Sequence, residues 1–283
     1  MTAHPSPARR LTRRNVLLGA VAAGSLATIG STAPTARADP PPFTVFGAVA
    51  SWPDLTAYGV RRLPMAYQSS LITSGLPDET KVRSAIGAQA DLGVSRVCLD
   101  IEAWPVDNVS DPDFAVSAGK FNQVMTWAHD EEPGLRLGWY GLLPRRDYWS
   151  PVLGNTAGWY ADNARRDVIA DEVDDLYPSI YTFYTDQTGW VTYANANMDQ
   201  AGIYGKPGYV FLWPKYHPSA PVDIRGTYLA AAYWRLQLET VLAHHQSTGS
   251  TIQGLVIWDD SPWDASADWW AETQAFLSDH GLA

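Results

Sequence analysis

The feature of this chain that most restricts its fold is the alternation of apolar runs of strand length with stretches of helical spacing. Near-continuous apolar strands that alternate with helices are typical of a parallel sheet covered by helices. The strand candidates are residues 44–51, 63–68, 96–102, 136–142, 176–182, 208–213 and 254–258. Helical spacing occurs at residues 79–92, 114–129, 157–173 and 228–246. The pattern predicts an α/β protein.

Seven strand candidates favour a TIM-like (β/α) barrel of seven or eight parallel strands, built as a single domain from residues 39–283. Such a barrel uses about 250 residues. The alternative is an open doubly wound sheet, which usually has a glycine-rich phosphate loop after its first strand. This chain has no such loop there. We therefore expect the barrel, with an active site at the C-terminal ends of its strands.

The first 38 residues have the pattern of a twin-arginine export signal. Arg13 and Arg14 precede an apolar run at 16–29, and an A-x-A cleavage site ends at Ala38. A membrane anchor is the alternative, but the run contains glycines and is shorter than the roughly 20 apolar residues of a span. We expect cleavage after residue 38, a secreted protein, and no membrane association afterwards.

The charge and the aromatic content of the chain restrict the classes of molecule that it is expected to bind. The chain has 20 basic and 30 acidic residues, and five arginines lie within residues 1–38, so cleavage leaves 15 basic residues and a charge of −15. Such a surface repels nucleic acid and disfavours a strongly anionic polysaccharide. The 13 Trp and 14 Tyr, against 7 Phe, suit a cleft that binds the flat faces of sugar rings. We expect a polysaccharide or oligosaccharide partner.

Two acids mark the predicted strand at 96–102. Alternation along a strand places Cys98, Asp100 and Glu102 on one face, with the acids at its C-terminal end, about 6.5 Å apart at the backbone. Two carboxylates in one site raise the pKa of one of them, as a general acid requires. We assign the proton to Glu102 and the negative charge to the deeper Asp100. The alternative is a structural pair that binds a helix N-terminus or a buried arginine.

The later strand ends carry aromatic residues, which suggests a ring around a pocket. Trp104 follows the acids, and further aromatic groups occur at 139–140, 177–181, 213–216 and 258. Asp259 shares a face with the strand interior and is a candidate substrate contact, although solvated loop charge is our preferred interpretation of it. The lone cysteine, Cys98, lies in an apolar run and is expected to be a buried thiol.

The sequence does not support a metal-dependent hydrolase or a serine hydrolase. No H-E-x-x-H or G-x-S-x-G motif occurs, and the adjacent His244 and His245 point to different faces of a predicted helix. We expect no metal and no cofactor.

Five short motifs, in order along the chain, resemble the hyaluronidase family of animal and venom enzymes. The segment 99–104, LDIEAW, resembles that family's catalytic strand I-D-W-E-x-W. Similar matches are GWYGL at 138–142, DLYPSIY at 175–181, YVF at 209–211 followed by Tyr216, and GLVIW at 254–258.

The resemblance implies a distorted barrel and a retaining, substrate-assisted glycosidase, an exception to the two-carboxylate scheme. Glu102 would be the general acid/base, and Asp100 would orient the N-acetyl group of the substrate. The same comparison implies that Tyr140, Tyr181, Tyr216 and Trp258 line the subsite for the reacting sugar.

The chain also departs from that family. Pro105 and Val106 stand where an arginine follows the tryptophan, and the family's disulfides are absent. Together with the charge of −15, these departures favour a neutral glycan that contains N-acetylhexosamine. A non-catalytic carbohydrate-binding barrel is the alternative function.

Overall fold

Short parallel strands form the centre of the protein. The computed structural model describes residues 41–49, 51–106, 109–110, 112–247 and 249–283, so the predicted export signal lies outside the described residues. The parallel strands are β1 (Thr44–Gly47), β2 (Val60–Arg62), β3 (Met65–Tyr67), β6 (Arg96–Asp100), β7 (Arg136–Trp139), β8 (Gly208–Leu212) and β9 (Ile252–Ile257). A short antiparallel pair, β4 (Ile72–Thr73) and β5 (Leu76–Pro77), was not predicted.

The parallel strands pair in two groups, in the orders β2-β1-β9-β8 and β3-β6-β7. Residues 176–182, predicted as a strand, form only isolated bridges, of which Tyr177 pairs with Tyr140 next to β7 and Ser179 pairs with Phe211 in β8. Pro178 interrupts this segment, and because proline has no backbone N–H, it cannot complete a ladder. The segment nevertheless links the two groups by hydrogen bonds.

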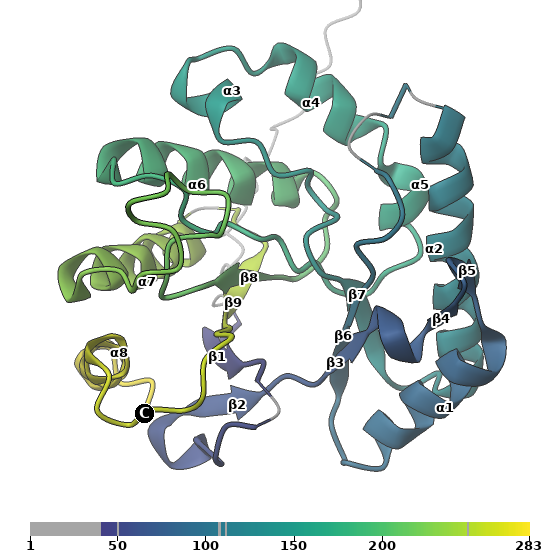
Figure 1. Cartoon of the computed structure of the whole chain (residues 1–283), viewed down its shortest axis with the longest axis horizontal. Helices are drawn as coiled ribbons and strands as arrows, with labels where there is room; N and C mark the ends of the chain where they lie inside the picture. Colours follow the sequence, from purple (N-terminus) through teal and green to yellow (C-terminus); the bar gives the residue numbers. More distant parts are fainter. Residues whose placement is uncertain (1–40, 50, 107–108, 111, 248) are drawn as a thin grey trace, which may run out of the picture. The chain divides into compact units, whose positions relative to one another are not determined.

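Helices lie on both sides of these strands. They are α1 (Glu79–Ala90), α2 (Pro112–Glu131), α3 (Trp149–Val152), α4 (Ala157–Ala164), α5 (Asp167–Ala170), α6 (Gln187–Gly202), α7 (Ala231–Gln246) and α8 (Asp268–Asp279). Two short 3-10 helices span Thr56–Tyr58 and Gln68–Ser70. In Figure 1, α1, α2 and α5 lie on one side of the strands, and α6, α7 and α8 lie on the other.

One predicted helix needed correction, and two of the longer helices were not predicted. The stretch 157–173 is not one helix, because α4 and α5 are separated at Arg166, whose side chain is fully buried. Helix α6 was not predicted, although Trp190, Tyr193 and Ala194 bury one face at helical spacing. Its N-cap is Asp186, whose carboxylate accepts a hydrogen bond from the Gly189 amide. The C-terminal helix α8 was not predicted either.

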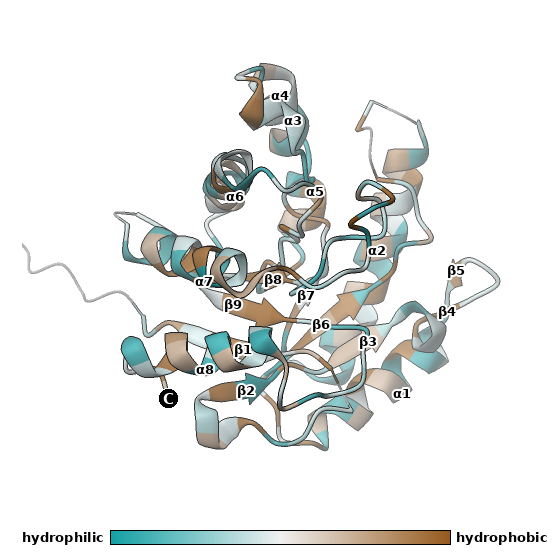
Figure 2. Cartoon of the chain, turned by 60° about the vertical axis from the view of Figure 1, so that its left-hand side comes forward, coloured by the Kyte–Doolittle hydropathy of each residue, from teal (hydrophilic) through white to brown (hydrophobic). Residues whose placement is uncertain are grey.

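Side-chain alternation along the strands divides the core into two clusters. On β6, Cys98 belongs to an inner cluster with Phe211 and Val256, whereas Val97 and Leu99 belong to the larger cluster beneath the helices. The predicted faces of β6 and the burial of Cys98 are confirmed. In Figure 2, β6 and β9 are largely brown and therefore hydrophobic, whereas β2 is teal. The inner cluster forms the floor on which Asp100 lies.

The described residues belong to one compact unit, Pro40–Ala283. Within that part of the chain, no helix combines the length and the apolar character that crossing a membrane requires.

Candidate active site

The two predicted acids lie together at the C-terminal end of β6. The strand ends at Asp100, which is partly buried, and Glu102 follows two residues later with its side chain exposed. Both line a cavity of about 190 Å³. The other residues that line it are Met65, Tyr67, Tyr140, Tyr181, Phe211, Trp213, His217, Pro218 and Trp258. We call this space the aromatic cavity.

Asp100, to which we assigned the negative charge, lies in a site that favours its protonated form. Burial and, to a smaller extent, the nearby negative charge of Glu102 raise the pKa of Asp100 to about 7. Asp100 Oδ1 is buried and has no hydrogen-bond partner in the described part of the chain. Because the apolar inner cluster keeps water from Asp100 while Glu102 remains exposed, burial favours the proton on Asp100, where we had expected the charge.

Three of the predicted aromatic residues, Tyr140, Tyr181 and Trp258, line the aromatic cavity. The ring of Tyr181 stacks on Trp258, with centroids 6.3 Å apart and an angle of 23° between the planes. Trp213 packs edge-on against Trp258 at 4.9 Å. Burial raises the pKa of Tyr140 to about 12, and its hydroxyl lies 3.3 Å from Ser179 Oγ. The aromatic part of the cavity wall is therefore closely packed and uncharged at neutral pH.

Tyr216 does not line this cavity. Its side chain is buried in the outer cluster, and its ring lies 6.4 Å from that of Tyr233 on α7. Trp104 is also largely buried, because its indole N–H donates to the Gly75 carbonyl at 2.9 Å and its ring packs on Phe121. Trp104 does not line the aromatic cavity but lines a second cavity.

Asp259 is buried, so its interpretation as a solvated loop charge is wrong. It accepts hydrogen bonds at 3.0 Å from the Trp213 indole N–H and from the Tyr228 hydroxyl. The Lys215 ammonium lies 3.0 Å from the same carboxylate. Asp259 does not line the aromatic cavity, but it holds Trp213, which does.

A second cavity of about 260 Å³ adjoins Glu102, and we call it the arginine cavity. Its lining includes Glu102, Trp104, Tyr140, Ser179, His217, Arg145, Arg146 and Arg166. The Arg146 guanidinium lies 4.7 Å from the centre of the Phe183 ring and donates to Ser179 Oγ. Within the described residues, Arg146 forms no ion pair, and the buried Nε and Nη1 of Arg166 have no hydrogen-bond partner.

Sequence reasoning missed these arginines. The only signal was the pair Arg145-Arg146 shortly after the predicted strand at 136–142. Arg166 comes from the break between α4 and α5, where no local pattern predicts a site. His217, which lines both cavities, was also missed.

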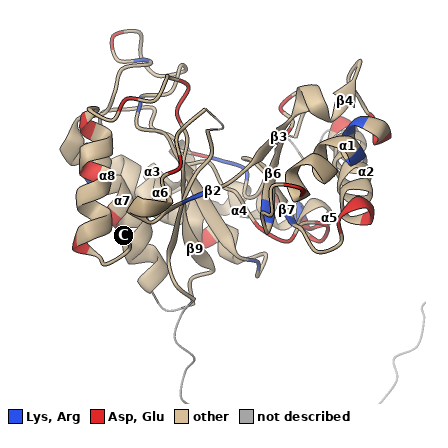
Figure 3. Cartoon of the chain, turned by 90° about the horizontal axis from the view of Figure 1, so that it is seen from below, with Lys and Arg blue, Asp and Glu red and all other residues tan. Residues whose placement is uncertain are grey.

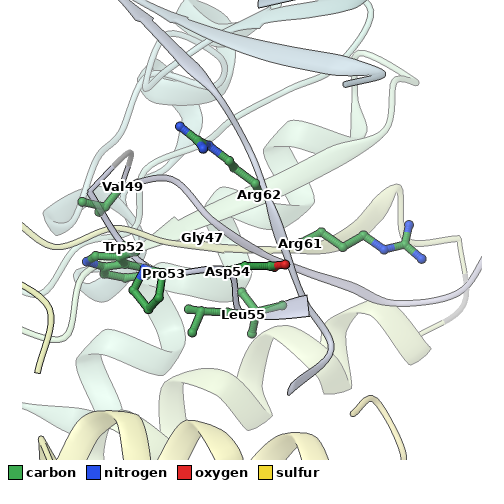
Figure 4. A pocket seen from close by; sticks show the side chains of 9 residues that line it. Gly47, Val49, Trp52, Pro53, Asp54, Leu55, Arg61 and Arg62 are labelled. Carbon is green, nitrogen blue, oxygen red and sulfur yellow. The ribbon is translucent and has the colours of Figure 1, made fainter. Parts of the chain in front are cut away.

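A third cavity of about 170 Å³ lies away from these acids (Figure 4). Its lining includes Trp52, Asp54 and Arg61, but neither Asp100 nor Glu102. Figure 3 shows that acidic residues are distributed over several elements, α8 among them. Among the described residues, no group of three His, Cys, Asp or Glu side chains could hold a metal ion. The aromatic and arginine cavities are therefore the candidate active site.

Parallel strands covered by helices, with the candidate acids at the C-terminal end of a strand, are typical of α/β barrel folds. A crystal structure of bee venom hyaluronidase superposes with a TM-score of 0.57 and 14% sequence identity, over 84% of this chain and 97% of that one. Bee venom hyaluronidase in complex with a hyaluronic acid tetramer gives a TM-score of 0.58 at 14% identity, over 83% and 95%. No protein-family model matches the sequence, and no curated protein matches it significantly.

Proposed function

We propose that this protein is a glycoside hydrolase, with Glu102 as the general acid/base and Asp100 as its partner. The observation that carries the proposal is the pair of acids at a strand end, between an aromatic cavity and a polar one. The proposal includes a closed barrel of seven or eight strands. Bridges through residues 176–182 support closure on one side. On the other side, the Leu63 amide bonds to Gly47 and the Cys98 amide bonds to the Pro64 carbonyl.

The pair of acids suits a substrate-assisted reaction on an N-acetylhexosamine. Burial favours one proton on Asp100 in the free protein. A substrate acetamido N–H that binds Asp100 stabilises its carboxylate, and the two coupled acids then favour the proton on Glu102. Glu102 donates this proton to the leaving oxygen while the acetamido oxygen attacks the anomeric carbon. Water then opens the intermediate, with Glu102 as the base.

The arginine cavity revises the expected charge of the substrate. The net charge of the chain favoured a neutral glycan, but charges farther away than about 8 Å are largely screened at physiological ionic strength. Arg145 and Arg146 line the space beside Glu102, and within the described residues Arg146 forms no ion pair, whereas the fully buried Arg166 is paired with Asp162. Guanidinium groups match carboxylates in geometry. We therefore propose a glycan whose sugar next to the cleaved bond carries a carboxylate.

Reducing-end release tests this function. The purified protein is incubated with hyaluronan, chondroitin and neutral N-acetylglucosamine oligomers, in parallel with Glu102→Gln. We expect cleavage of an acidic polymer, reduced in the variant by at least about a hundredfold, the scale of general acid catalysis. Binding without cleavage would favour the carbohydrate-binding alternative. Cleavage of neutral oligomers alone would refute the acidic substrate but keep the glycosidase.

Export of the protein is a separate proposal, based on the pattern in residues 1–38. Replacement of Arg13 and Arg14 by lysine should retain the protein inside a host that has the twin-arginine pathway. Fractionation of cells and medium, followed by N-terminal sequencing of the exported form, tests both export and cleavage after Ala38.

A further inference from the structure

His217 lies where the two cavities meet. It lines both of them, as do Glu102 and Tyr140. It follows β8 by a few residues, in the loop that also carries Trp213. Neither its residue type nor its spacing marked it in the sequence. A side chain in this position is adjacent to sugars on both sides of the bond that Glu102 would protonate.

One edge of the His217 ring is occupied by the protein itself. The backbone N–H of Ser219 lies 3.0 Å from Nδ1 and donates to it. Only an unprotonated nitrogen can accept this bond, so the ring proton is on Nε2. The opposite edge of the ring therefore presents an N–H donor. Within the described residues, no protein group is hydrogen-bonded to Nε2.

Aromatic side chains hold the ring in place. Its centroid lies 4.8 Å from that of Phe183, 6.0 Å from Trp213 and 6.2 Å from Tyr181. These contacts fix the plane of the imidazole, and the bond from Ser219 fixes its rotation within that plane. The direction of the Nε2–H group is thus set before any ligand binds, which lowers the entropy lost on binding.

The surroundings also keep the imidazole uncharged. Burial, together with the positive charge of Arg146, lowers the pKa of His217 to about 4. The charged and titratable groups that share its cavities are Asp100, Glu102, Arg145, Arg146, Arg166, Tyr67, Tyr140 and Tyr181. A donor that is neutral near pH 7 is suited to binding an oxygen acceptor and unsuited to proton transfer at that pH.

We propose that His217 is a substrate-binding residue whose Nε2–H donates a fixed hydrogen bond to an acceptor oxygen of the sugar chain as the chain crosses from the aromatic to the arginine cavity. The inference rests on the proposed function, since the acceptor belongs to the substrate of that site. It adds a specificity-determining contact between the two groups of subsites. A sugar without an acceptor at this position leaves this donor without a hydrogen-bond partner in the complex and binds more weakly.

Two amide variants test the roles of the two ring nitrogens of His217 independently. His217→Asn places its amide near Nδ1, so it keeps the contact with Ser219 and loses the donor. His217→Gln reaches the position of Nε2 and keeps a donor. Cleavage kinetics are measured on the best substrate of the panel. Dissociation constants for a hyaluronan tetrasaccharide are measured in the Glu102→Gln background, and thermal melts check folding.

We expect His217→Asn to weaken binding about tenfold, as the loss of one buried hydrogen bond predicts, and His217→Gln to remain within about threefold of the parent. The nitrogen chemical shifts of His217 should show the proton on Nε2 down to pH 5. Equal binding by both variants and the parent, or a proton on Nδ1, would overturn the inference. If turnover is absent but the tetrasaccharide binds, the glycosidase proposal fails while the binding comparison still decides the role of His217. If neither the tetrasaccharide nor any polymer of the panel is bound or cleaved, both fail.

Discussion

Replacement of Asp100 by asparagine should stabilise the protein at high pH while abolishing its proposed activity. The pKa of Asp100 rises from 3.8 to about 7 in the folded protein. Between these values the folded state binds more protons than the unfolded state, so stability falls as pH rises through this window and is constant above it. The full change corresponds to about 4 kcal/mol at about 1.4 kcal/mol per pH unit.

The change between pH 5 and pH 8 is the quantity to measure. Over this range Asp100 should lower the free energy of unfolding of the wild type by about 2.5 kcal/mol relative to Asp100→Asn. The comparison between two pH values cancels any constant cost of burying the amide. Oδ1 of Asp100 has no hydrogen-bond partner in the described part of the chain, so the substitution breaks no bond there.

Urea unfolding followed by tryptophan fluorescence gives the required free energies. Glu102→Gln should reduce the pH-dependent difference, because the charge of Glu102 contributes to the raised pKa of Asp100. Asp223→Asn, in an exposed loop, is the control and should change stability by less than about 0.5 kcal/mol at either pH. A difference between wild type and Asp100→Asn that does not grow from pH 5 to pH 8 would refute the reasoning.

Three further predictions concern residues that position the site or pack the strands beneath it. Asp259→Ala should destabilise the protein by about 3 kcal/mol in urea unfolding, because it removes the acceptor of Trp213 and a partner of buried Lys215; loss of less than 1 kcal/mol would contradict this. Arg146→Met should raise the pKa of His217, because the Arg146 charge lowers it; an unchanged titration by nuclear magnetic resonance would exclude that coupling. Gly254→Ala should cost about 3 kcal/mol, because a Cβ there overlaps the Thr44 carbonyl oxygen of the neighbouring strand. The matched Gly158→Ala in α4 meets no atom and should stabilise the fold by about 0.5–1 kcal/mol in the same assay; equal effects would refute the steric argument.

Local periodicity accounts for what the sequence predicted well. Strand alternation depends only on neighbouring residues, so it placed Cys98 inside and Asp100 above it. Strand-end position likewise brought Tyr140, Tyr181 and Trp258 to the same cavity. Six of the seven predicted strand segments contain strands of the structure, and the seventh forms bridges with its neighbours.

Only the tertiary structure decided which strand-end residues reach the cavities. Past the end of a strand no period constrains the chain, so Tyr216 packs against α7 while the nearby His217 lines both cavities. The positions of Arg146 and Arg166 depend on how distant loops pack beside Glu102.

The protonation of the two acids, Asp100 and Glu102, also depends on the tertiary structure. The sequence by itself determined that two carboxylates share a strand end and that aromatic residues surround them. Which acid holds the proton depends on desolvation, and desolvation depends on every segment that packs around each group. The inner cluster from several strands buries Asp100 and leaves Glu102 exposed. That asymmetry comes from the packing of the whole domain, which no single segment of the sequence encodes.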